Sequence, residues 1–213
     1  MALAAGAANA QENKGKMLAG VSAAEIASIM TDLKIESEQL PVPGNEPTIV
    51  GMLPSGAKFL VSLGACSEKS ENCQVIQYSA IFVAKPLPLA DFNTFNSRFA
   101  FGKAFQTREE EENRMVIRHA VIVAEGISRK AVKENMVLFV QVTGFFVRFL
   151  SERMNTVSAS ADKPAGDKPD AITNVAGELP ADQTLASFGE TARKHPGIIN
   201  KVTAKEAPKW AIK

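Results

Sequence analysis

Residues 115–150 read MVIRHAVIVAEGISRKAVKENMVLFVQVTGFFVRFL, a strand pattern followed closely by a helix pattern. Residues 115–123 have the pattern of a β-strand, but both faces of this strand carry mostly apolar side chains. From Ser128 to about Met154, apolar residues recur on nearly every side of a helix. Both elements therefore need neighbours on two sides, which predicts a sheet with helices packed against it.

The sequence before this stretch extends the same architecture. Ser22-Ala-Ala-Glu25 is typical of a capped helix start, and this helix is expected to end near Leu33. A second, short helix is expected to be capped by Asp91. Strands are expected at residues 48–52, 58–65, 74–83, 103–107 and 114–123, with weaker alternation at 34–40. We interpret the order as α-β-β-β-α-β-β-α, an α+β fold with helices packed on an antiparallel sheet, followed by a largely irregular C-terminal tail.

Composition divides the chain into three parts. Residues 1–20 contain Ala8-Asn9-Ala10 after an alanine-rich stretch, a pattern that signal peptidase accepts, although no basic residue precedes it. We interpret this part as an export-signal remnant and disordered N-terminus, which predicts a periplasmic or otherwise exported protein; the alternative is a plain alanine-rich end on a cytoplasmic protein. Residues 21–154 form the predicted α+β domain. Residues 155–213 are expected to be a linker and a disordered or docking tail, with Leu185 and Phe188 as candidate docking side chains.

The overall composition narrows the possible functions. The 24 Lys and Arg balance 23 Asp and Glu, and a net charge of +1 predicts no nucleic-acid partner. Two Cys and two His are too few for the common zinc sites, and we expect no metal and no cofactor. No long apolar stretch is free of charge, so no transmembrane segment is expected. Because 12 aromatic residues are Phe and few side chains suit catalysis, we do not expect an enzyme.

The middle of the chain resembles a known family. Asn93, Phe95 and Asn96, followed by Phe101-Gly102-Lys103-Ala104, look like the helix-to-strand motif of the YbjN-like family, bacterial proteins described as sensory transduction regulators. The resemblance covers roughly residues 21–154. It implies a fold similar to type III secretion chaperones and no known catalytic residues. Phe95 stands where the family usually has tryptophan, and Ala100 where it often has arginine, so a polar role near Ala100 is not carried over.

Cys66 and Cys73 flank a short polar segment between two predicted strands. Paired cysteines at this place also look like those of exported members of the family. In an exported protein they are expected to form a structural disulfide. A redox-active pair and two free cysteines are the alternatives, although the spacing is not Cys-x-x-Cys.

Two apolar surfaces are candidates for an interface. They lie on the second side of the 115–123 strand and on the far side of the last helix: Val116, Ala120, Ile122, Val137, Val140, Gly144 and Val147. Internal packing under the first helix or the tail would cover them, and a homodimer or a protein client is the alternative.

Two classes of function follow from the sequence. The first is a non-catalytic, chaperone-like regulatory module of the bacterial envelope that binds protein through these apolar surfaces. The second is a small-molecule or lipid binder, or an enzyme, with a pocket near His119 and Arg118. His119 is otherwise expected to be a core histidine that bonds to a backbone group.

Overall fold

The chain folds around one large antiparallel sheet. The computed structural model describes residues 17–41, 46–109, 111–160 and 199–200, and side chains through Met154. The sheet has the order β2-β3-β4-β5-β7-β6, and β9 pairs with β5. Its strands are β2 (Glu36–Leu40), β3 (Thr48–Met52), β4 (Lys58–Gly64), β5 (Val75–Val83), β6 (Lys103–Glu109), β7 (Glu112–Ile122) and β9 (Ile199–Asn200).

Three helices and a small second sheet complete the described part. The helices are α1 (Ala23–Asp32), α2 (Leu89–Arg98) and α3 (Arg129–Ser160), and the second sheet pairs β1 (Met17–Leu18) with β8 (Ile127–Ser128). The predicted α+β class is confirmed. The weakly alternating residues before Leu40 form a full strand, so four strands rather than three lie between α1 and α2.

Local signals explain where the helices begin. The Glu25 N–H donates to the Ser22 hydroxyl at 3.3 Å, and the Ala131 N–H donates to the Ser128 hydroxyl at 3.0 Å, so each serine caps its helix. The predicted cap at Asp91 is wrong: α2 begins at Leu89 with Pro88 as its N-cap residue, and no side chain makes a capping hydrogen bond there. Asp91 lies instead in the first turn of α2.

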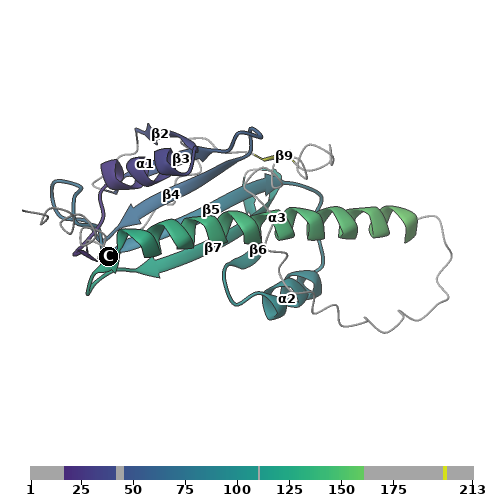
Figure 1. Cartoon of the computed structure of the whole chain (residues 1–213). Helices are drawn as coiled ribbons and strands as arrows, with labels where there is room; N and C mark the ends of the chain where they lie inside the picture. Colours follow the sequence, from purple (N-terminus) through teal and green to yellow (C-terminus); the bar gives the residue numbers. More distant parts are fainter. Residues whose placement is uncertain (1–16, 42–45, 110, 161–198, 201–213) are drawn as a thin grey trace, which may run out of the picture.

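All three helices pack on the same face of the sheet (Figure 1). The apolar residues of α1, α2 and α3 belong to one core with alternate residues of the strands. Aromatic rings join the layers: Phe139 of α3 lies 5.5 Å from Tyr78 of β5, and Phe146 lies 5.0 Å from Phe95 of α2. α3 is therefore apolar nearly all round because the sheet and α2 both pack against it.

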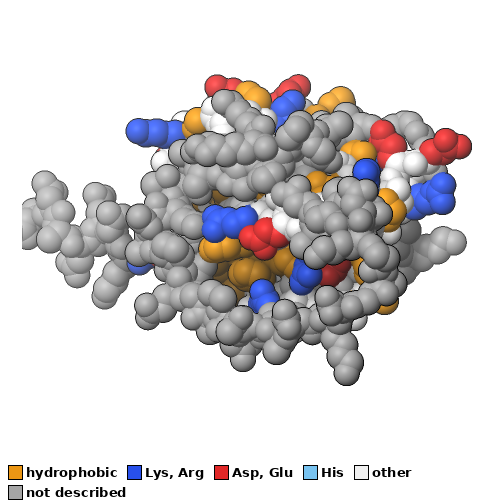
Figure 2. Space-filling model, turned by 90° about the vertical axis from the view of Figure 1, so that its right-hand side faces the viewer, with side chains coloured by type: hydrophobic (Ala, Val, Ile, Leu, Met, Phe, Trp, Pro, Cys, Tyr) orange, Lys and Arg blue, Asp and Glu red, His pale blue; other side chains and the backbone are white. Residues whose placement is uncertain are grey.

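The end of the molecule toward which α3 extends carries a mixed surface. Hydrophobic side chains gather near the middle of this view, with basic and acidic side chains beside them (Figure 2). Within the described residues, no helix is long and apolar enough to cross a membrane.

Candidate functional site

The face of the large sheet opposite the helices is the candidate site, and we call it the helix-free face. It contains a second, smaller apolar cluster of Val50, Leu60, Ile81 and Val116, with Leu40 and Phe105 packed against it. In the part of the chain that the structure describes, the buried apolar residues of all three helices belong to the other, larger core. This face therefore has an apolar centre, and none of the described helices packs on it.

The structure separates the two groups of predicted interface residues. Val116, Ala120 and Ile122 alternate along β7 on the helix-free face, where Val116 is buried and Ala120 and Ile122 are exposed, Ile122 by 77%. The other four predicted residues lie on α3, on the opposite side of the sheet. They cannot form one continuous surface with the β7 residues.

Two of the α3 residues correct the sequence interpretation. Val140 and Val147 are 2% and 0% exposed and belong to the larger core, so they offer a partner no surface. They face inward because the sheet and the neighbouring helices together cover a wide arc of α3. Val137 and Gly144 are half-buried.

Polar side chains line the helix-free face beside its apolar cluster. Thr48 of β3 donates its hydroxyl hydrogen to the Ser62 hydroxyl of β4 at 3.1 Å. The side chain of Gln77 in β5 is 1% exposed, and no acceptor lies near its Nε2 among the residues that the structure describes. Arg118 of β7 places its guanidinium 5.1 Å from the ring centre of Phe105, and its buried Nε likewise lacks a described acceptor.

These two donors lie close together. Gln77 pairs with Ala120 across β5 and β7, and Arg118 pairs with the next residue of β5 on the same face, Ser79. Partial burial also lowers the pKa of Arg118 from its usual value, because water is removed from the charged form. A ligand with carbonyl or carboxylate oxygens would satisfy both donors.

His119 lies on the other face of β7 and is held by side chains. Its Nε2 forms a hydrogen bond of 3.3 Å with Asn135 Oδ1 of α3, so the expected backbone partner is replaced by a side chain. The ring stacks on Tyr78 at 6.2 Å and meets the edge of Phe101 at 5.5 Å. Burial raises the pKa of Tyr78 well above its usual range, so its hydroxyl stays neutral.

A hollow on the described surface does not include His119. It is lined by one side of α3, from Lys130 to Gln141. No cluster of three or more potential metal-ligating side chains occurs within the described ranges. His119 and Arg118, which the pocket hypothesis placed together, point to opposite faces of β7.

The family-like motif has a structural role in this chain. Asn96 Nδ2 donates to the Ala104 carbonyl at 2.9 Å, and the Ala104 N–H donates to Asn96 Oδ1 at 2.7 Å. Phe95 is buried against α3, whereas Asn93 and Lys103 are exposed. Gly102 has a φ of 76°, a conformation that favours glycine, and it turns the chain from α2 into β6.

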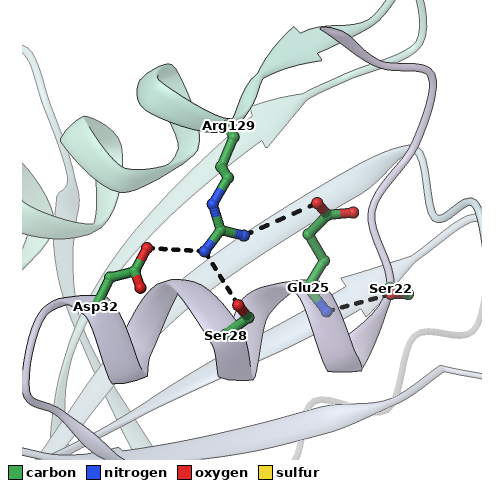
Figure 3. A network of polar contacts seen from close by, with 5 residues as sticks. All are labelled: Ser22, Glu25, Ser28, Asp32 and Arg129. Carbon is green, nitrogen blue, oxygen red and sulfur yellow. Dashed lines mark hydrogen bonds and ion pairs between the residues drawn. The ribbon is translucent and has the colours of Figure 1, made fainter. Parts of the chain in front are cut away.

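A second polar cluster joins α3 to α1, and sequence reasoning missed it. Arg129 Nη2 donates to Asp32 Oδ2 at 2.8 Å and to the Ser28 hydroxyl at 3.1 Å, and Nη1 lies 3.9 Å from Glu25 Oε1 (Figure 3). These partners are about a hundred residues apart in sequence, so no local pattern signals the contact. The cluster fixes the start of α3 against one side of α1.

Cys66 and Cys73 are joined by a disulfide between β4 and β5. The backbone of Cys73 also exchanges two hydrogen bonds with Val21, at 2.9 and 3.1 Å. The bond therefore ties the β4–β5 connection beside the entry to α1. The candidate docking residues Leu185 and Phe188 lie outside the described residues.

Comparisons with known proteins identify a family. A family model described as "YbjN: Putative bacterial sensory transduction regulator" matches residues 22–152, more than half of the chain. A solved structure titled "Crystal structure of YbjN, a putative transcription regulator from E. coli" is similar at 15% sequence identity and a TM-score of 0.41, over 68% of this chain and 96% of that chain. No curated protein matches the sequence.

Proposed function

The chain belongs to the YbjN family, and from this we propose that it is a non-catalytic regulatory module that binds a protein through the helix-free face. The observation that carries the proposal is the sheet itself. The three helices of the described part of the chain pack on one face, and the other face has its own apolar cluster. Ala120 and Ile122 are exposed beside this buried cluster and form an apolar patch with it, and exposed apolar surface of this kind is typical of a binding surface.

The exposed edge of this patch is the part that a partner would reach first. Ile122 is 77% exposed at the end of β7, and Ala120 beside it is also exposed. The donors of Gln77 and Arg118 lie next to these side chains along the same face. Apolar contacts with nearby hydrogen-bond donors suit an extended polypeptide, whose backbone supplies carbonyl oxygens.

A charged side chain at the exposed edge tests the proposal. Ile122→Asp replaces an exposed apolar contact by a carboxylate, and Leu89→Asp is the matched control, because Leu89 is 75% exposed on α2. Losing the burial of one isoleucine costs about 1.5–3 kcal/mol, so affinity is expected to fall about tenfold or more. The measurements are light scattering of the purified full chain and capture of a partner from bacterial envelope extract.

The expected result is that the wild type and Leu89→Asp give the same dimer or captured partner and that Ile122→Asp loses it. A homodimer would identify the partner as a second copy, and a captured protein would identify a client. If Ile122→Asp keeps the assembly at wild-type affinity, the helix-free face does not carry the function.

The same proposal places the protein in the bacterial envelope. The disulfide supports this location, because such bonds persist in oxidising compartments. We further propose that residues 21–154 form the main part of the binding domain, preceded by an export-signal-like segment and followed, beyond the end of α3 at Ser160, by a linker and tail. Cell fractionation combined with thiol alkylation tests the location: both cysteines should resist alkylation in the envelope fraction, and two free thiols on a cytoplasmic protein would overturn it.

A further inference from the structure

The helix-free face is buried although no described helix lies on it. Leu60, Gln77 and Ser79 are 0%, 1% and 3% exposed. Side chains on the open face of a sheet normally contact water. Neighbouring side chains of the same sheet account for part of this burial, but the centre of the face needs an additional cover.

One short strand shows which part of the chain approaches this face. β9 pairs antiparallel with the last residues of β5, where Val83 faces Ile199 and Phe82 faces Asn200. The chain therefore runs from Ile199 to Asn200 in the direction of Ser79. At Ser79, however, the pairing position beside β5 is already taken by Leu60 of β4.

A chain that follows this direction must leave the plane of the sheet. One side is filled by α3 and the larger core, where Phe82 packs against Phe146 at 6.1 Å. The helix-free face is the side that remains. Residues 201–213 can span about 40 Å when extended, which exceeds the roughly 30 Å length of β5.

The terminal sequence has the chemistry that the face requires. Residues 201–213 read KVTAKEAPKWAIK and contain apolar side chains at Val202, Trp210 and Ile212. Backbone carbonyls are hydrogen-bond acceptors, which is the group that the unsatisfied donors of Gln77 and Arg118 require. The other end of the chain enters elsewhere, since β1 pairs with β8 and not with the large sheet.

From this geometry we infer that residues 201–213 are the occupant of the helix-free face. The proposed contact is between this segment, which follows β9, and the cluster of Val50, Leu60, Ile81 and Val116. If the proposed function is right, the segment competes with the protein partner for the same face, so the module carries its own inhibitor.

Photo-crosslinking within the purified full chain tests this inference. p-Benzoylphenylalanine is placed at Ala120 or at Phe105, both on the helix-free face, and at Leu89 as the control on α2. The crosslinked peptides are mapped by mass spectrometry at a dilution at which chains do not associate. Phe105 is the conservative site, because an aromatic ring replaces an aromatic ring.

Crosslinks from position 105 or 120 to a peptide within residues 201–213, and none from position 89, are the expected result. Trp210 is the only tryptophan of the chain, so acrylamide should quench its fluorescence several-fold less than that of the free peptide KVTAKEAPKWAIK. Crosslinks only to residues 1–16, to residues 161–198 or to a second chain would overturn the inference, as would their absence. The experiment needs no partner, so its failure leaves the test of the proposed function at Ile122 intact.

Discussion

Replacing Asn96 by alanine is expected to destabilise the fold by about 2–4 kcal/mol. The Asn96 side chain makes two hydrogen bonds to the backbone of Ala104, at 2.7 and 2.9 Å, and Ala104 is buried. Each lost bond costs about 1 kcal/mol net, and about 2 kcal/mol where the group left behind is buried and unpaired, so two lost bonds cost about 2–4 kcal/mol. The substitution leaves both the N–H and the carbonyl of Ala104 without these partners.

Urea unfolding followed by circular dichroism measures this loss. Asn96→Asp keeps the acceptor for the Ala104 N–H but places a second carboxylate oxygen against its carbonyl, so it is expected to lose at least half as much stability as Asn96→Ala. Ser97→Ala is the control, because its exposed hydroxyl only donates to the Thr94 carbonyl within the same helix. A free energy of unfolding for Asn96→Ala within 0.5 kcal/mol of the wild type would refute the reasoning.

Three further substitutions test other parts of the fold. Cys66→Ser with Cys73→Ser opens a short loop and is expected to lower the free energy of unfolding by about 2–3 kcal/mol, measured by urea unfolding without reductant against the disulfide-bonded wild type; reduced wild type should match the double variant. Arg129→Ala should lower the free energy of unfolding by about 1 kcal/mol, and by more at low than at high salt. Lys130→Ala, whose ion pair with Glu134 is largely exposed, should lower it by less than about 0.5 kcal/mol; equal losses would contradict the role of the cluster. Burial raises the pKa of Tyr78, so above about pH 10 the tyrosine ionises more readily in the unfolded chain than in the folded one, and the free energy of unfolding falls as pH rises. Tyr78→Phe lacks this group and should therefore lose less stability between about pH 9 and 11 than the wild type does.

The sheet was predictable because its central strands are short apolar runs bounded by turn residues. β3, β4, β5 and β7 lie within a few residues of the predicted ranges. β1, β8 and β9 have two residues each, which is too short for any period to appear. α3 continues past Met154 to Ser160, because no proline or glycine interrupts residues 155–160.

The candidate site was only partly predictable from the sequence. The alternation of β7 identified Val116, Ala120 and Ile122 as unusual for an exposed face, and this surface is the helix-free face. Val140 and Val147, on the far side of α3, were wrongly predicted to be accessible to a partner. How much of a helix surface is buried depends on where its neighbours lie, and the helix sequence alone does not give this. Gln77 gave no signal, since a single polar residue in a strand is ordinary until its neighbours are known.

The unsatisfied donors of the helix-free face indicate the chemical class of its ligand. A buried donor without an acceptor costs about 1–3 kcal/mol, and Gln77 Nε2 and Arg118 Nε share one region of the face. An occupant with carbonyl oxygens recovers this cost, whereas a lipid acyl chain covers the apolar cluster and leaves both donors unpaired. The difference of several kcal/mol favours an extended polypeptide over a lipid. Because the segment after β9 and a protein partner both offer backbone carbonyls, the same two donors would serve both and would make their binding mutually exclusive.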